Sequence, residues 1–205
     1  MILETLTTGP YDTNCYVYAS DHGGSAAVID PGGDSALILR RVEASALNVV
    51  YIVLTHGHPD HTGALRELKE ATGAEVAMHA ADADFLRDNV LASMLGLRAS
   101  CPQPPDCLLN DGQTLAVGEA MLTAIHTPGH SRGSICLLGD GLVFTGDTLF
   151  RIGVGRTDLP GGNYADLIRN IHTKLLSLPA DTKVYPGHGP PTTIGDEKRH
   201  NPFLG

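Results

Sequence analysis

The hydrophobic residues of this chain fall into short runs, separated by turns rich in glycine, proline, asparagine and aspartate. In the first half, β-branched apolar runs predict strands, and apolar residues at helical spacing predict the helices between them. The run NVVYIVLT is continuous, which is typical of a strand buried on both faces. The predicted strands lie at residues 2–8, 14–20, 25–33, 48–55 and 75–80, and the predicted helices at 35–45, 63–73 and 81–97.

The second half begins with the proline-rich segment CPQPPDC, residues 101–107, which we interpret as a surface loop. The pattern then becomes β-rich, with one amphipathic helix predicted at 164–178. The predicted strands lie at residues 113–118, 120–127, 134–139 and 141–146, with a further strand and loop at 183–189. We therefore expect one α/β domain over residues 1–205, in which two β-rich halves carry helices outside as a four-layer αββα sandwich.

Composition excludes several classes of protein. A hydrophobic content of 42% and a charged content of 18% are those of an ordinary soluble domain. No apolar stretch approaches the roughly 20 residues of a membrane span, and the first residues lack a basic leader segment, so we expect a cytoplasmic protein with no membrane partner. The net charge of −9 argues against a nucleic-acid partner. Cys15, Cys101, Cys107 and Cys136 contain no C-x-x-C pair; we expect reduced, mostly buried thiols, with a Cys101–Cys107 disulfide as the alternative.

The most informative polar segment is THGHPDH, residues 55–61, directly after the run at 48–55. Gly57 and Pro59 suit a simple turn, but a turn gives no reason for three imidazoles and a carboxylate together. Three further polar residues also follow apolar runs and sit in glycine-containing turns. They are His130 in TPGHS, Asp147 in TGDT and His188 in PGHG. Because sites in α/β proteins usually lie at the carboxyl ends of strands, we expect these turns to meet.

The set that would meet contains five histidines and two aspartates, namely His56, His58, Asp60, His61, His130, Asp147 and His188. Imidazole and carboxylate ligands suit zinc, iron or manganese. Seven ligands exceed the needs of one tetrahedral ion, so we expect two divalent metal ions that share a bridging carboxylate, with zinc as the first choice and iron or manganese as alternatives. Asp30, in IDPGG after another strand, is either a hydrogen-bond partner of a ligand histidine or a simple turn residue.

The motif THGHPDH with the later His130, Asp147 and His188 resembles the metallo-β-lactamase superfamily, whose fold is αββα. The segments TPGHSRGS, FTGDTLFRIGVGRTDLPGG, YPGHGPPTT and NPFLG resemble more closely the short glyoxalase II-like (hydroxyacylglutathione hydrolase) proteins of bacteria, over essentially the whole chain. The resemblance implies that Asp147 bridges two ions, where the familiar zinc β-lactamases have Cys. It also implies that His56, His58 and His130 bind the first ion, and that Asp60, His61 and His188 bind the second.

Such a site predicts a particular chemistry. Two cations can lower the pKa of a shared water towards about 7, and the resulting hydroxide would attack a thioester carbonyl. The thiolate leaving group, whose parent thiol has a pKa near 8.5, departs without a strong general acid. Asp60 and Asp147 are the catalytic residues of this hypothesis, since Asp60 would orient the hydroxide and Asp147 would hold both ions.

Arg132, Arg151 and Arg156 each follow a predicted ligand and could form a positive rim for an anionic substrate. In full-length glyoxalase II, a Lys and a Tyr in the loop after the bridging aspartate help to bind glutathione. The resemblance places Arg156 at the Lys position, as a substrate-binding residue, and Asp158 at the Tyr position. Full-length glyoxalase II also continues past NPF into a helical segment with basic residues, whereas this sequence ends at Gly205.

We therefore predict a binuclear metal-dependent hydrolase acting on a small-molecule thioester, S-D-lactoylglutathione or a related compound. The alternative enzyme is a mononuclear iron persulfide dioxygenase, a sister family with a similar GRTD segment, residues 155–158 here. From a different class, the chain could bind metal without catalysis.

Overall fold

The computed structural model describes residues 1–97 and 104–205 of the chain. Cys101 lies outside the described residues, and so does the alternative disulfide that would include it. The thiols of Cys15 and Cys136 are buried, as predicted, and Cys107 is partly buried.

The first sheet has six strands in the order β1-β2-β3-β4-β5-β6. The strands β1 to β3 pair antiparallel, and β3 to β6 pair parallel. Because the parallel strands run in one direction, the segments after β3, β4 and β5 leave the sheet at the same edge. The strands are β1 (Ile2–Thr8), β2 (Thr13–Ala19), β3 (Ser25–Ile29), β4 (Asn48–Val53), β5 (Glu75–Met78) and β6 (Cys107–Leu108).

The second sheet also has six strands, in the order β14-β13-β10-β9-β8-β7, and only the β10–β13 pair is parallel. A two-stranded hairpin of β11 (Leu149–Phe150) and β12 (Gly153–Val154) follows β10. The strands of the sheet are β7 (Thr114–Val117), β8 (Ala120–His126), β9 (Ile135–Gly139), β10 (Leu142–Gly146), β13 (Lys183–Pro186) and β14 (Thr192–Thr193).

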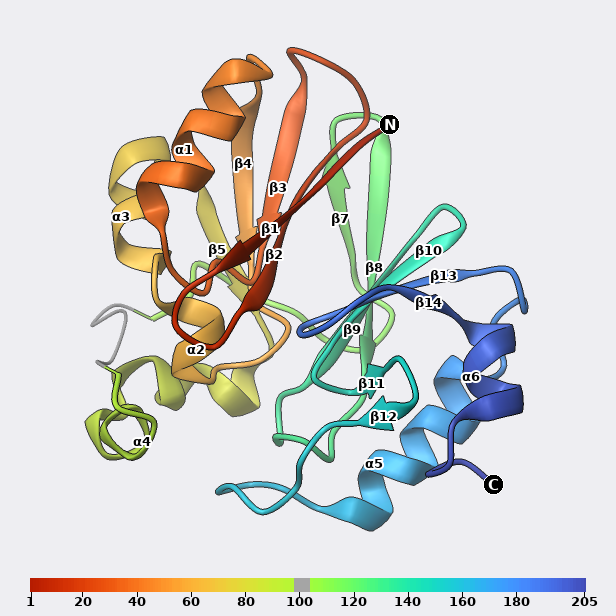
Figure 1. Cartoon of the computed structure of the whole chain (residues 1–205). Coiled ribbons are helices and arrows are strands. Elements are labelled where there is room, and N and C mark those ends of the chain that lie inside the picture. The colour runs from red at the N-terminus through yellow and green to blue at the C-terminus, as the bar shows by residue number, and fades with distance from the viewer. Residues whose placement is uncertain (98–103) are drawn as a thin grey trace.

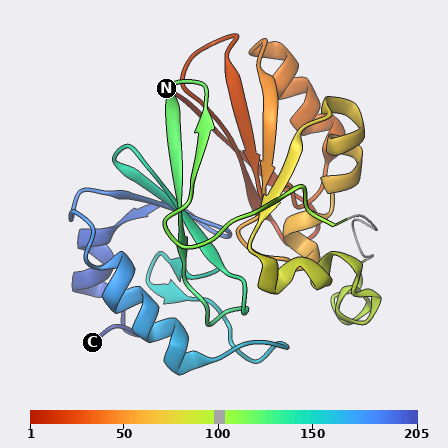
Figure 2. The same ribbon diagram turned by 180° about the vertical axis from the view of Figure 1, so that it is seen from behind.

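Helices cover the outer face of each sheet (Figures 1 and 2). The first sheet carries α1 (Ser35–Ala44) and α3 (Leu65–Thr72), and the second carries α5 (Tyr164–Asn170), a π-helical turn (Ile171–Leu175) and α6 (Ile194–His200). Three hydrophobic cores fill the spaces between the layers, one under each helical layer and one between the sheets. The predicted αββα sandwich is therefore confirmed. We keep the single domain over residues 1–205 as a prediction, which the core shared by the two sheets supports.

The predicted helix at 81–97 is wrong as a single element. A 3-10 helix covers Ala80–Arg87, and α4 (Asn89–Met94) begins after Asp88. Asp88 adopts an extended conformation, and its carboxylate accepts hydrogen bonds from the backbone N–H groups of Val90 and Leu91. An aspartate stabilises a helix more as its N-cap than in its interior, so the chain restarts its helix there.

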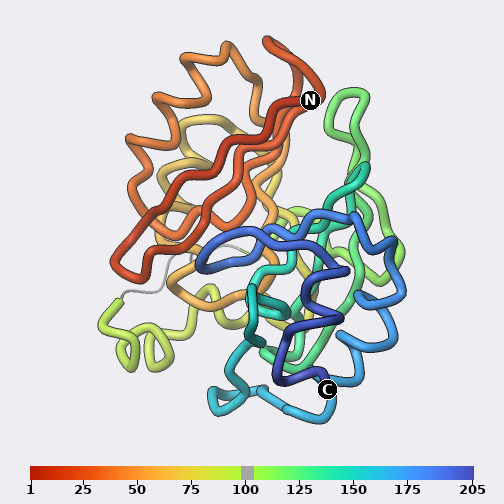
Figure 3. The backbone as a smooth tube through the Cα atoms, turned by 45° about the vertical axis from the view of Figure 1, so that its right-hand side comes forward, coloured from red at the N-terminus to blue at the C-terminus, as the bar shows by residue number. Residues whose placement is uncertain are grey.

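Two segments of opposite sheets meet at the carboxyl edge of the sandwich. The loop after β13 lies beside the β1–β2 hairpin, as Figure 3 shows, and Thr13 forms an isolated antiparallel bridge with His188. The Asn14 side chain donates to the carbonyl oxygens of Pro186 at 3.0 Å and Gly189 at 2.7 Å. These bonds hold the loop that carries His188 against the first sheet.

Candidate metal centre

The motif THGHPDH occupies the loop after β4 and a short helix, α2 (Pro59–Thr62). His58 is the N-cap residue of α2 in an extended conformation, and Pro59 occupies the first helical turn, where its missing N–H costs nothing. His56 and His58 therefore project from the loop, whereas Asp60 and His61 project from the helix.

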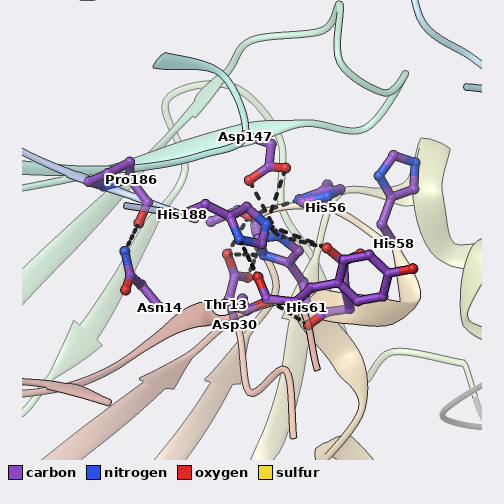
Figure 4. A network of polar contacts seen from close by, with 12 residues as sticks. Thr13, Asn14, Asp30, His56, His58, His61, Asp147, Pro186 and His188 are labelled. Atoms are coloured by element: carbon purple, nitrogen blue, oxygen red, sulfur yellow. Dashed lines mark hydrogen bonds and ion pairs between the residues drawn. The ribbon is translucent and has the colours of Figure 1, made fainter. Parts of the chain in front are cut away.

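The other three predicted residues reach the same place from the second sheet. His130 lies in the turn between β8 and β9, Asp147 directly follows β10, and His188 follows β13. Figure 4 shows the side chains of His56, His61, Asp147 and His188 converging, with His58 beside them. The structure thus brings together the seven side chains that the sequence singled out as metal ligands.

Three of these histidines form a first cluster. His130 Nε2 lies 3.2 Å from His56 Nε2 and 2.9 Å from His58 Nδ1. A tetrahedral ion at about 2.0–2.1 Å from each nitrogen would set such nitrogens about 3.3–3.4 Å apart. The three atoms are therefore close to the spacing that one ion requires.

Asp60, His61 and His188 form a second cluster. His188 Nε2 lies 3.2 Å from His61 Nε2 and 3.4 Å from Asp60 Oδ2. Asp147 stands between the two clusters. Its carboxylate lies 3.3 Å from His61 Nε2 on one side and 3.7 Å from His130 Nε2 on the other. This is the position of a residue that could contact two ions.

The outer nitrogens of four rings face hydrogen-bond acceptors. These contacts are His130 Nδ1 to the Arg156 carbonyl at 2.7 Å, His61 Nδ1 to Asp30 Oδ2 at 3.0 Å, His188 Nδ1 to the Tyr11 carbonyl at 3.1 Å and His56 Nδ1 to Thr55 Oγ1 at 3.1 Å. Thr55 Oγ1 donates its own proton to Asp30, so it accepts from His56. Each outer nitrogen of a neutral ring therefore carries the proton.

The inner nitrogens then present lone pairs to one another and to two carboxylates. Such an arrangement is repulsive unless a cation occupies its centre. Within the described residues, Asp147 Oδ1 is buried without a hydrogen-bond partner, which leaves an acceptor free for the same purpose. The donor set fits two divalent cations, because imidazole and carboxylate suit zinc, iron and manganese.

The pKa values of His56, His58 and Asp147 favour the forms that bind a cation. Burial, with the neighbouring His61, holds the pKa of His56 well below its usual value, and burial lowers that of His58 to about 3. Burial alone would raise the pKa of Asp147, but His61 outweighs it and holds the carboxyl ionised. Burial alone would lower the pKa of His61, but Asp147 and Asp30 hold it well above the usual value.

Two buried carboxylates outside the clusters position the loops and rings of the site through hydrogen bonds. Asp30 accepts from the Thr55 backbone N–H at 2.7 Å as well as from Thr55 Oγ1 and His61, so of the two alternatives for Asp30 the structure shows the hydrogen bond to a histidine of the motif. Asp82 was not predicted. It links the two loops that carry the first cluster, because it accepts from Gly57 N at 3.1 Å, Ser131 Oγ at 2.6 Å and Gly133 N at 2.6 Å.

The close approach of Asp82 explains two glycines. A Cβ atom at Gly133 would lie 2.7 Å from Asp82, and one at Gly57 would lie 2.6 Å from its carbonyl oxygen. No spacing in the sequence could reveal these contacts, since Asp82 is 25, 49 and 51 residues from its three partners. The one local signal is the presence of Asp82 and Asp84 shortly after β5, and it does not identify a partner.

A pocket of about 410 Å³ opens onto the clusters. The three arginines of the predicted rim do not act together. Arg156 lines this pocket, whereas Arg151 lines a separate one beside α6. Arg132 lines neither of these pockets. Its Cγ atom lies near Gly161, 3.3 Å from the position that a Cβ would take there. The Arg156 guanidinium is paired with Asp158, with Nε to Oδ1 at 2.7 Å and Nη2 to Oδ2 at 2.8 Å.

Comparison with known proteins defines the class. The family profile of the metallo-beta-lactamase superfamily matches residues 8–188. The chain belongs to the metallo-beta-lactamase superfamily. The hydroxyacylglutathione hydrolase GloC of Haemophilus influenzae is 39% identical over 209 residues, which cover 100% of this chain and 98% of that protein.

Solved structures of similar proteins share this fold. The B3 metallo-beta-lactamase BLEG-1 superimposes with a TM-score of 0.94 at 38% identity, over 99% of each chain. TTHA1623, determined in a di-iron-bound form, gives a TM-score of 0.89 at 38% identity over 98% of this chain and 100% of that one. ETHE1 from Myxococcus xanthus gives a TM-score of 0.82 at 32% identity, over 98% of this chain and 84% of that one. The chain is thus a member of a metal-dependent, generally hydrolytic superfamily, with a cluster of His and Asp side chains able to hold metal. Within the described ranges, no helix has the length and apolar character needed to cross a membrane.

Proposed function

We propose that this protein is a binuclear metal-dependent hydrolase that cleaves S-D-lactoylglutathione or related thioesters. The observation that carries the proposal is the pair of clusters that share Asp147, with their lone pairs directed inward. The similarity to GloC, which is named as a hydroxyacylglutathione hydrolase, supports the thioester as substrate.

In this proposal His56, His58 and His130 hold one ion, and Asp60, His61 and His188 hold the other, with Asp147 shared. Zinc is the metal we propose; the di-iron-bound TTHA1623 makes iron the first alternative to test, before manganese. When bound, the two cations would supply an activated water at neutral pH and positive charge for a developing oxyanion.

The chain itself contributes orientation. Asp60, whose carboxylate is almost covered and lies 3.4 Å from His188 Nε2, accepts a hydrogen bond from the attacking water and fixes its direction. Asp30 holds the His61 ring through its Nδ1–H, and the Tyr11 carbonyl does the same for His188. The thiolate product needs no protonation as it leaves. Arg156, at the rim and paired with Asp158, is the proposed contact for a carboxylate where the thioester carries one.

A persulfide dioxygenase remains the second candidate, on the strength of the GRTD segment, residues 155–158. That reaction needs one iron. It would leave no role for the convergence of Asp60, His61 and His188, whose ligand atoms lie within 4.8 Å of one another. The geometry therefore favours the hydrolase.

We also propose that the enzyme works in the cytoplasm, because Cys15, Cys107 and Cys136 are free thiols, as expected in a reducing compartment.

One experiment separates these functions. Metal content of gently purified protein would be measured by elemental analysis, together with turnover of S-D-lactoylglutathione and a panel of thioesters. We expect about two metal equivalents and thioester hydrolysis. A single iron that reconstitution does not increase, with oxygen uptake in the presence of glutathione persulfide, would instead establish the dioxygenase.

A further inference from the structure

We infer that the pocket selects uncharged thioesters that carry an apolar chain, and that Asp158 is a specificity-determining residue because it neutralises Arg156. The inference rests on the proposed thioester hydrolysis and names the class of thioester that the site prefers.

The walls of the pocket are apolar. Around the proposed metal ligands, the lining side chains are Tyr11, Leu95, Phe150, Val154 and Leu159, and all of them are at least partly exposed. The Phe150 ring packs against His188 with centroids 6.3 Å apart, so apolar surface reaches the proposed second ion. The Tyr11 hydroxyl donates to the Leu95 backbone carbonyl at 2.7 Å, which holds the Tyr11 ring beside Leu95. An apolar chain bound here would remove both its own surface and these side chains from water.

The charge of the pocket does not favour an anion. Among the described residues that line it, Arg156 is the one cation outside the proposed ligands. Both of its contacts with Asp158 lie on the Nε–Nη2 edge of the guanidinium, so one of the two edges that could bind a substrate carboxylate through two hydrogen bonds is already occupied. The hydrogen bond from Arg156 lowers the pKa of Asp158 to about 2, so the carboxylate is charged at neutral pH. An anionic substrate must therefore either displace Asp158 or bind Arg156 beside the negative charge of Asp158.

The test compares two thioesters of the same acid, S-D-lactoylglutathione, which is anionic, and S-D-lactoyl-N-acetylcysteamine, which is neutral. Asp158→Asn frees the guanidinium, so the ratio of kcat/KM for the glutathione thioester to that for the neutral one should rise about two- to fivefold. The increase should shrink as salt is added, because the effect is electrostatic. Asp166→Asn is the matched control, since it removes a carboxylate paired with an exposed arginine, Arg169 at 2.7 Å, that does not line the pocket. The ratio of the two kcat/KM values measured for Asp166→Asn should equal that of the wild type.

The apolar walls are tested with the wild-type enzyme on acetyl, butyryl and hexanoyl thioesters of N-acetylcysteamine. We expect kcat/KM to rise about two- to fourfold per methylene, the upper figure corresponding to the roughly 0.8 kcal/mol of a fully buried methylene. Leu159→Asn, which makes one wall of the pocket polar, should reduce the rise in kcat/KM per methylene.

The outcomes are distinct. A flat series in the wild type, or an unchanged ratio in both Asp158→Asn and Asp158→Ser, would overturn the inference while leaving thioester hydrolysis in place. Absence of turnover for every thioester, with both metals bound, would overturn the proposed function and the inference together.

Discussion

Asp82 connects the two loops that carry His56, His58 and His130, and its replacement by Asn tests whether a buried carboxylate sets their spacing. The Asp82 side chain is 1% exposed and accepts three hydrogen bonds, two on Oδ2 and one on Oδ1. Asn has nearly the same shape but only one accepting oxygen. If that oxygen keeps Gly57 and Ser131, the new NH2 group faces the N–H of Gly133, which donates to Asp82 at 2.6 Å in the native protein.

The magnitude follows from these contacts. A hydrogen bond to a charged group contributes about 1.5–3 kcal/mol, and a buried donor left without a partner costs about 1–3 kcal/mol. Asp82→Asn should therefore lower the free energy of unfolding of the metal-free protein by about 3–5 kcal/mol. Loosening of the two loops should also weaken the ion held by the three histidines, by about ten- to a hundredfold, as for other residues that orient metal ligands.

Urea unfolding of the metal-free proteins, followed by zinc titration of the folded ones, measures both effects. Asp84→Asn is the matched control. Asp84 lies in the same 3-10 helix, its side chain is fully exposed and it approaches Arg87 at 3.5 Å, so the free energy of unfolding of this variant should change by less than about 0.5 kcal/mol. If Asp82→Asn loses less than about 1 kcal/mol and binds zinc as tightly as the wild type, the three hydrogen bonds do not position the ligands.

Three further predictions concern the site and the thiols. Asp147→Ala should abolish most thioester turnover and release at least one ion, as measured by elemental analysis, because the two cations lose their shared negative charge; retention of both ions with near-normal turnover would make the ligand assignment wrong. Arg156→Ala should lower kcat/KM for S-D-lactoylglutathione by about three- to tenfold, because it removes the cation that balances the charge of Asp158 beside an anionic substrate, and equal losses on a neutral thioester would mean that Arg156 supports the fold. Burial raises the pKa of Cys136 to about 11, so its thiol stays protonated at pH 8, and iodoacetamide should label Cys107 much faster than Cys136 in the native protein; equal labelling by mass spectrometry would contradict the buried assignment.

Much of the architecture follows from local patterns in the sequence. The helix predicted at 63–73 forms as α3 and ends at Gly73, which takes the left-handed conformation that glycine adopts freely. The apolar run at 48–55 forms β4, paired on both sides. The residue types of THGHPDH and of the three later turns identify a candidate metal centre because each lies directly after a strand, and strand ends are fixed by short-range periodicity.

Only the tertiary structure decides how those residues combine. The division into two clusters around Asp147 depends on the packing of one sheet on the other, which places His130 and His188 opposite α2 and the loop before it. The orienting role of Asp82 arises from contacts across 25 to 51 residues, and no periodicity encodes such distances. Asp158 is only two residues from Arg156, yet whether the two side chains pair or point apart depends on the loop that follows β12. Hydrophobic patterning specifies which surfaces must be buried, but the hydrogen bonds of a polar site form between whichever groups the buried surfaces bring together.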